Sequence, residues 1–139
     1  MEYRFSKITK AMTWVMQAIA ALIMLQTLFF KFSGAEESIY IFTIVGMEPW
    51  GRYGSGVVEL IASILLMIQS LAWLGAVVGA GIMTGALFFH LTILGIQVKG
   101  DHDQLFAYAL IAFICCLGIL WMRRKEVLYI NKFFLSEQK

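Results

Sequence analysis

Four apolar segments, each long enough to cross a lipid bilayer as a helix, dominate this chain of 139 residues. A helix rises ~1.5 Å per residue, so a hydrocarbon core of ~30 Å needs about 20 apolar residues. The chain is 60% hydrophobic and only 14% charged, whereas about 25% of the residues in soluble domains are charged. We therefore predict an all-α integral membrane protein, a single four-helix bundle. Its expected spans are residues 11–30, 54–73, 74–96 and 105–122.

Lysine and arginine predict how these spans are oriented. Three of the 11 cationic residues precede the first span and five follow the last. Because cationic segments stay on the cytoplasmic side, we expect a multi-pass protein with both termini in the cytoplasm. In a bacterial inner membrane, the location that we expect, the acidic loops would face the periplasm. The first span is too long for a signal-peptide core, so we expect it to be retained. The cations on the predicted inner side are Arg4, Lys7, Lys10, Arg123, Arg124, Lys125, Lys132 and Lys139.

The first predicted periplasmic loop, SGAEESIYIFTIVGMEPWG, is long and only weakly polar. Ser33 and Glu36 have the spacing of a capping box before the apolar run IYIFTIV. We expect a short interfacial helix here, with Trp50 and Tyr53 as anchors. A short strand is the alternative, because β-branched residues dominate the run. Either element would cover one end of the bundle as a lid.

The second and third spans meet at AWLGA with almost no loop, which predicts a tight antiparallel hairpin. The third span contains two glycine pairs with a spacing of four, Gly75 with Gly79 and Gly81 with Gly85. This spacing puts the small residues on one side of a helix, where backbones can approach closely in lipid. We assign both pairs to helix packing.

Polar side chains from all four spans reach the outer third of the predicted bilayer. Glu59 lies ~7–8 Å below the outer start of its span, and His90 lies ~9 Å below the outer end of the next. Lys31 ends the first span, and Tyr108 lies one turn into the fourth. Because ionisable residues inside membranes are functional by default, we expect an outward-facing polar pocket. Its predicted members are Glu59, His90, Lys31, Tyr108, Arg52 and Gln26.

These residues also have structural interpretations, which the sequence leaves open. Lys31 fits a cation that reaches the interface from a helix end, and Tyr108 fits an interfacial aromatic residue. His90 fits a packing residue bonded to a backbone carbonyl. Glu59 fits an acid kept neutral by desolvation, or one paired with Lys31 or Arg52 for structural reasons.

Other classes of function find little support in the sequence. Only two histidines exist and His102 belongs to a loop, so we expect neither haem nor a metal site. Cys115 and Cys116 are adjacent in an apolar run, which predicts buried, inert thiols. No self-contained catalytic motif occurs, and a net charge of +2 without an arginine-rich surface argues against nucleic-acid binding. Gln17 and Gln69 are expected to form interhelical hydrogen bonds.

The order of these residues resembles the DoxX-like family of small four-span bacterial membrane proteins. The matching features are Lys31 at the end of the first span, EPWGRYGSGVVELIASILLMI, and TGALFFHL, which ends one residue after His90. The resemblance covers residues 11–122 and identifies the chain as a divergent member. It implies a four-helix bundle with an outward-opening pocket and an association with quinone redox chemistry.

Three functional hypotheses follow. In the first, which the resemblance implies, the chain is a quinone-associated accessory subunit in which Glu59 exchanges protons and His90 bonds a quinone oxygen. Its electrons come from a membrane or periplasmic redox protein, because the chain has no redox centre. In the second, the pocket binds or transports a lipid or small amphiphile, with an apolar wall of Phe88, Phe89 and Phe106. In the third, the third span docks another membrane protein as an assembly factor.

Overall fold

The computed structural model describes residues 7–136, in which every regular element is a helix and no strand occurs. The prediction of an all-α protein is therefore confirmed for this part of the chain. Arg4 and Lys139, two of the cations used to predict the orientation, lie outside it. The elements are α1 (Lys7–Ser33), α2 (Glu36–Val45), α3 (Trp50–Met67), α4 (Ala72–Phe89), the π-helix η1 (His90–Leu94), α5 (Gln104–Met122) and α6 (Arg124–Ser136).

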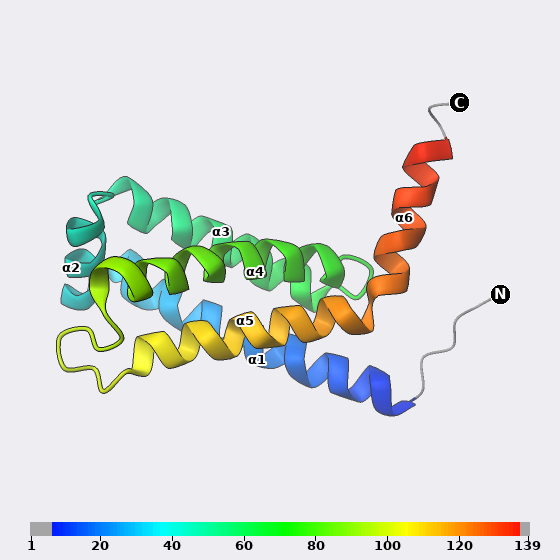
Figure 1. Cartoon of the computed structure of the whole chain (residues 1–139), viewed down its shortest axis with the longest axis horizontal. Helices are drawn as coiled ribbons and strands as arrows, with labels where there is room; N and C mark the ends of the chain where they lie inside the picture. The colour runs from blue at the N-terminus through cyan, green and yellow to red at the C-terminus, as the bar shows by residue number, and fades with distance from the viewer. Residues whose placement is uncertain (1–6, 137–139) are drawn as a thin grey trace.

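Four long helices run alongside one another around a shared core (Figure 1). Helix α1 packs against α3 and α5, and α4 packs against the same two helices. Helix α2 lies at one end of this group and α6 leaves the opposite end, referred to below as the α2 end and the α6 end. The core consists of Ala20, Met24, Ala62, Leu66, Ala76, Met83, Ala109, Ala112, Cys115, Cys116 and Ile119.

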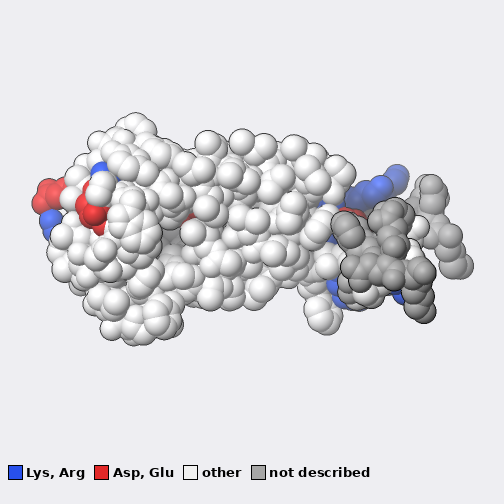
Figure 2. Space-filling view, turned by 90° about the horizontal axis from the view of Figure 1, so that it is seen from above, with Lys and Arg blue, Asp and Glu red and all other residues white. Residues whose placement is uncertain are grey.

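Three helices are long and apolar enough to cross a membrane, namely α1, α5, and α4 continued by η1. Their surfaces expose large apolar side chains such as Leu22, Phe29 and Leu91, and extended exposure of this kind marks contact with lipid or with other proteins. On the face shown in Figure 2, charged residues gather at the two ends and the surface between them is almost uncharged. Helix α3 is not among the three, and it carries the charged residues Arg52 and Glu59.

The second predicted span differs most from the structure. The sequence analysis predicts it over residues 54–73 with its joint at AWLGA, whereas α3 occupies Trp50–Met67. The helix stops because Ile68 has an extended backbone, so the turn lies at residues 68–71 and AWLGA begins α4. The apolar run continues through this turn, and for that reason hydropathy alone does not locate it.

The other predicted spans lie close to observed helices. Residues 11–30 fall within α1, and residues 105–122 coincide with α5 except for its first residue. Residues 74–96 correspond to α4 and η1, although the helical backbone ends at Leu94. Helix α6 was not predicted.

The α3–α4 hairpin is tight because Gly75 has no side chain. A Cβ atom on Gly75 would lie 2.6 Å from the backbone nitrogen of Leu66 and 3.0 Å from the carbonyl oxygen of Ala62. Gly79 faces α5, where a Cβ atom would lie 2.8 Å from Sγ of Cys116. This first glycine pair therefore allows the close helix contacts that its spacing predicts.

The second glycine pair does not pack within the part of the chain that the structure describes. A Cβ atom on Gly81 or Gly85 would meet nothing within 4 Å. Thr84, on the same helix, is exposed, and its hydroxyl donates to the carbonyl oxygen of Ala80. The assignment of both pairs to packing is thus correct for Gly75 and Gly79 alone.

The lid element is helical, as expected, and α2 contacts α1, α3 and η1. Glu36 and Glu37 lie in its first turn, where the helix dipole favours negative charge. Gly46 ends the helix in the left-handed region, with φ 79°. The predicted capping box is wrong, because Ser33 belongs to the end of α1 and Ala35 occupies the N-cap without a side-chain hydrogen bond.

An exposed ion pair joins α2 to the loop before α5. Lys99 Nζ lies 2.7 Å from Glu36 Oε1 and 5.1 Å from the centroid of the Tyr40 ring. The hydrogen bond from Lys99, together with its charge, lowers the pKa of Glu36. The same hydrogen bond raises the pKa of Lys99.

The pH dependence of this link has a definite sign. Glu36 has a lowered folded-state pKa, so its contribution is complete above the unfolded pKa and is lost as the pH falls through the folded value. Lys99 has a raised pKa, so its contribution is complete below the unfolded pKa and is lost as the pH rises through the folded value. We expect the melting temperature of Lys99→Gln to fall less than that of the wild type on acidification. If the melting temperatures of the two proteins fall equally on acidification, the ion pair contributes nothing to stability.

Candidate functional site

Glu59 is buried in the bundle and forms an ion pair with Lys31. Its side chain is 3% exposed, and its Oε1 lies 2.5 Å from Nζ of Lys31, which is 14% exposed. A single charge buried at this position would be strongly unfavourable, whereas a hydrogen-bonded pair is tolerated. Of the two partners that the sequence leaves open for Glu59, the structure selects Lys31.

The other carboxylate oxygen of Glu59 is bound by Thr27. Thr27 Oγ1 lies 2.9 Å from Glu59 Oε2 and 2.8 Å from the carbonyl oxygen of Met24. Since a hydroxyl has one hydrogen, Thr27 donates to one of these two acceptors at a time, and the charged carboxylate is the stronger acceptor. Thr27 and Lys31 are one turn apart on α1, so both point to the same face of that helix. Sequence reasoning missed Thr27, although its spacing from Lys31 was a usable signal.

Arg52 holds the end of α1 beside this pair. Its guanidinium binds both carboxylate oxygens of Glu48 at 2.7 to 3.0 Å and lies 4.4 Å from the centroid of the Tyr53 ring. It also donates to the carbonyl oxygen of Lys31, one of the acceptors that a helix end leaves without an intrahelical partner. Arg52 therefore acts on the backbone of Lys31 and not on the carboxylate of Glu59.

His90 lies at the start of η1 and is 5% exposed. Its Nδ1 is 2.9 Å from the carbonyl oxygen of Gly95, and its ring meets Phe106 edge-on with centroids 5.7 Å apart. Because a carbonyl oxygen can only accept, Nδ1 carries a hydrogen and donates it to Gly95. This is the contact that the structural interpretation of His90 predicts.

The remaining predicted site residues take separate positions. The hydroxyl of Tyr108 accepts a hydrogen bond of 3.0 Å from Gln104 on the same helix, and Gln26 is exposed on α1. Hydrogen bonds within the described part of the chain join three of the six predicted residues into one network, referred to below as the Lys31–Glu59 network: Lys31, Glu59 and Arg52.

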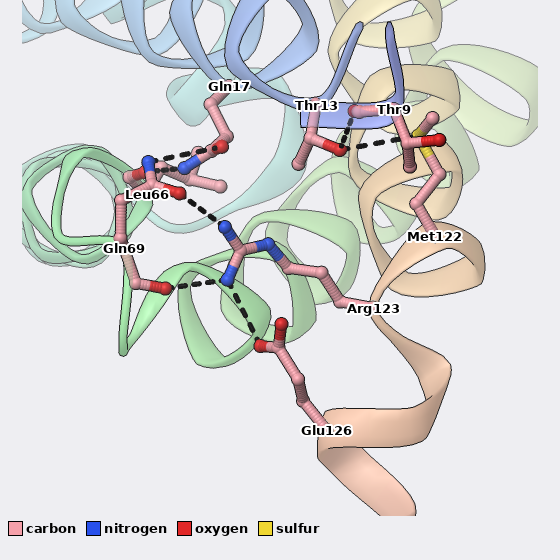
Figure 3. Close-up of polar contacts among 8 residues, drawn as sticks. All are labelled: Thr9, Thr13, Gln17, Leu66, Gln69, Met122, Arg123 and Glu126. Atoms are coloured by element: carbon pink, nitrogen blue, oxygen red, sulfur yellow. Dashed lines mark hydrogen bonds and ion pairs between the residues drawn. The ribbon is translucent and has the colours of Figure 1, made fainter. Parts of the chain in front are cut away.

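A second polar cluster, at the α6 end, is built around Arg123 (Figure 3). Arg123 is 8% exposed, and its Nη1 donates to the backbone oxygen of Gln69 at 2.6 Å and to Glu126 at 3.0 Å. Its Nη2 donates to the side-chain oxygen of Gln69. Gln69 donates to Gln17 at 3.4 Å, and Gln17 donates to the carbonyl oxygen of Leu66. The interhelical hydrogen bond expected of Gln17 is confirmed, whereas Gln69 lies in the α3–α4 turn and bonds to α1 from there.

A cavity of about 530 Å³ opens beside this cluster. Sequence reasoning missed it, because Arg123 was assigned only to the charge that orients the spans. The signal was its position directly after an apolar span, where a buried cation needs partners. The lining includes Lys10, Thr13, Trp14, Ser70, Arg123 and Glu126.

In the acidic loop before α5, the first acid, Asp101, is hydrogen-bonded to the backbone around it. The Asp101 carboxylate accepts hydrogen bonds of 3.0 to 3.1 Å from the backbone N–H groups of Val98, Asp103 and Leu105. Within residues 7–136, no group of three or more His, Cys, Asp or Glu side chains could hold a metal ion. Both cysteines are buried, as expected.

Comparison of the chain with family models, curated proteins and solved structures found no match. The resemblance to the DoxX-like family stays a prediction from the residues quoted for it. The described residues form two polar clusters, the Lys31–Glu59 network at the α2 end and the Arg123 cluster at the α6 end.

Proposed function

We propose that the chain is a four-span protein of the bacterial inner membrane with both termini in the cytoplasm. Three helices have the length and hydropathy that spanning requires, and α3 packs against two of them, α1 and α4. The polar residues of α3 support its role as the fourth span, because Arg52 and Glu59 are 5% and 3% exposed and so avoid lipid. The cations at the α6 end support the orientation: Lys7, Lys10, Arg123, Arg124, Lys125 and Lys132.

We propose further that the chain is a DoxX-like protein whose α2 end binds the head group of a quinone-type amphiphile, as an accessory subunit of an oxidoreductase. The observation that carries this proposal is the buried Lys31–Glu59 pair beside α2. Two residues that carry the resemblance are hydrogen-bonded partners. Lys31, the more exposed of the two, is the member that a ligand can reach first.

The donor set of this network fits a quinone head. The Lys31 ammonium has three N–H donors for a ligand oxygen and for Glu59, and its Nζ lies 5.8 Å from the centroid of the Phe42 ring, an apolar surface on α2. A bound quinone takes up two electrons and two protons when it is reduced to the quinol. Lys31 stabilises negative charge on the ligand oxygen, and Glu59, held by Thr27, exchanges the protons. The electrons come from a redox protein of the membrane or periplasm.

The hydrogen bond of His90 to Gly95 limits which of its ring nitrogens can contact a ligand. With Nδ1 committed to Gly95, Nε2 is the ring nitrogen of His90 that remains for a ligand oxygen. The bond of His90 to a quinone head therefore forms through Nε2.

Titration of the purified protein with a short-chain ubiquinone, followed by tryptophan fluorescence, tests this proposal. We expect Glu59→Gln to weaken binding about tenfold or more, because it removes the carboxylate that holds the Lys31 ammonium in the site and exchanges protons there. Glu37→Gln is the matched control, since Glu37 is an exposed acid of α2, and it should bind as the wild type does.

Equal affinities for the three proteins contradict the proposal. Binding of a phospholipid in place of the quinone, lost in Glu59→Gln alone, selects the amphiphile-binding hypothesis. Co-purification of another membrane protein at fixed stoichiometry with no bound amphiphile selects the assembly hypothesis.

A further inference from the structure

We propose that the cavity at the α6 end binds a phosphate group, and that an anionic phospholipid of the adjacent leaflet supplies it. The cavity is formed by the first turns of α1, the α3–α4 turn and the α5–α6 junction. It is separate from the Lys31–Glu59 network, so this inference does not depend on the quinone proposal.

The strongest observation is an unsatisfied donor on the buried Arg123 that lines the cavity. Arg123 is 8% exposed, and its Nε is the one buried side-chain nitrogen or oxygen of the described residues that has no hydrogen-bond partner. A buried donor without an acceptor is costly. On a planar guanidinium, Nε and Nη2 share one edge, and Nη2 already donates to Gln69, so Nε is the donor of this edge that lacks an acceptor. An anion in the cavity, which Arg123 lines, balances the charge of this guanidinium.

The rest of the lining favours an anion with several oxygens. Lys10 adds a second cation and Ser70 adds a hydroxyl donor. Glu126 is the acid of the lining and is already bonded to Arg123, so the three charged side chains carry a net positive charge. A phosphate group therefore meets more attraction than repulsion, and it competes with Glu126 for the guanidinium.

Two tryptophans suggest that the phosphate belongs to a lipid. Trp14 lines the cavity and is 43% exposed, and Trp121 in the last turn of α5 is 70% exposed with Arg124 4.7 Å from its ring centroid. Exposed tryptophans of membrane proteins lie at the level of the lipid head groups. The volume of about 530 Å³ is in the range of small-molecule sites, ~300–1,000 Å³, and exceeds the space that one phosphate ion fills.

Native mass spectrometry of the full chain in a neutral detergent tests the proposal. The probes are dioleoylphosphatidylglycerol, dioleoylglycerol, which lacks the phosphate, and inorganic phosphate. We expect phosphatidylglycerol to bind and dioleoylglycerol not to bind. Lys10→Gln should weaken binding about fivefold, the effect of one cation near a lipid surface, whereas Lys7→Gln, a matched change one turn earlier on α1, should weaken it less than about twofold.

A gain of affinity gives a second, independent result. Glu126→Gln should strengthen phosphatidylglycerol binding about fivefold, because it frees Arg123 and removes the opposing charge. A purely structural role for these residues does not produce tighter binding. Lys10→Gln and Glu126→Gln both change side chains at the rim, so they keep the test decisive if changes at the buried Arg123 prevent folding.

Each outcome is decisive. Binding of inorganic phosphate alone, with the same response to Lys10→Gln, supports the phosphate site and assigns it to a free phosphate. Equal binding of dioleoylglycerol and phosphatidylglycerol overturns the proposal, and so does an equal effect of Lys7→Gln and Lys10→Gln. Failure of both phosphate-bearing probes to bind the wild type also overturns it.

Discussion

Replacement of Glu59 by leucine should lower the free energy of unfolding by about 3–5 kcal/mol, the cost of leaving one member of a buried ion pair alone. In the folded protein Glu59 is 3% exposed and binds Lys31 and Thr27. Leucine removes the carboxylate and leaves the half-buried ammonium of Lys31 without a counter-ion, whereas Thr27 keeps the carbonyl oxygen of Met24 as an acceptor. Reversible unfolding of the purified protein in mixed micelles measures the change.

The double variant Lys31→Met/Glu59→Leu is the control for this prediction. Replacing both charges by apolar side chains removes the uncompensated charge, and such replacements are often neutral or stabilising. The double variant should therefore be at least about 2 kcal/mol more stable than Glu59→Leu. If both variants lose the same free energy, the loss comes from the shape of the leucine side chain and not from the broken pair.

The substitution Gly75→Ala should cost about 3 kcal/mol, the upper part of the range for overpacked sites. The added Cβ would lie 2.6 Å from the backbone nitrogen of Leu66 and 3.0 Å from the carbonyl carbon of Leu65. Backbone atoms of a packed helix cannot turn aside as a flexible side chain can. The α3–α4 hairpin must therefore open to admit one methyl group.

Gly85→Ala on the same helix is the matched control. A Cβ atom there would meet nothing within 4 Å, so alanine should leave stability unchanged or raise it by up to about 1 kcal/mol through helix propensity. Unfolding of the two variants side by side separates close packing from a general effect of the methyl group. Equal losses of stability would contradict the packing argument.

The features that follow from continuous apolar runs of membrane length were predicted well. Hydropathy located α1, α5 and most of α4, because each is a continuous apolar run of membrane length. The short helix α2 was also predicted, although the capping box used to predict it is absent from the structure, and Lys31 was among the partners considered for Glu59. Each of these predictions depends on the position of one helix, or on which ends of two helices lie on the same side.

The features that depend on backbone geometry could not be predicted. The turn at residues 68–71 lies inside an apolar run, so its position and the start of α4 were displaced. The hydrogen bond of His90 to Gly95 requires the π-helical turn η1, which has no hydropathy signature. The cavity beside Arg123 requires three chain segments to meet, and none of them marks the site alone.

The measurement that tests the central claim most directly is native mass spectrometry of the protein extracted gently from its own membrane. Wild type, Glu59→Gln and Glu37→Gln are compared under the same conditions. We predict a bound quinone-type amphiphile in the wild type and in Glu37→Gln, and its loss in Glu59→Gln. A wild-type protein without such a ligand, or a ligand retained equally in all three proteins, would contradict the assignment of the Lys31–Glu59 network as its binding site.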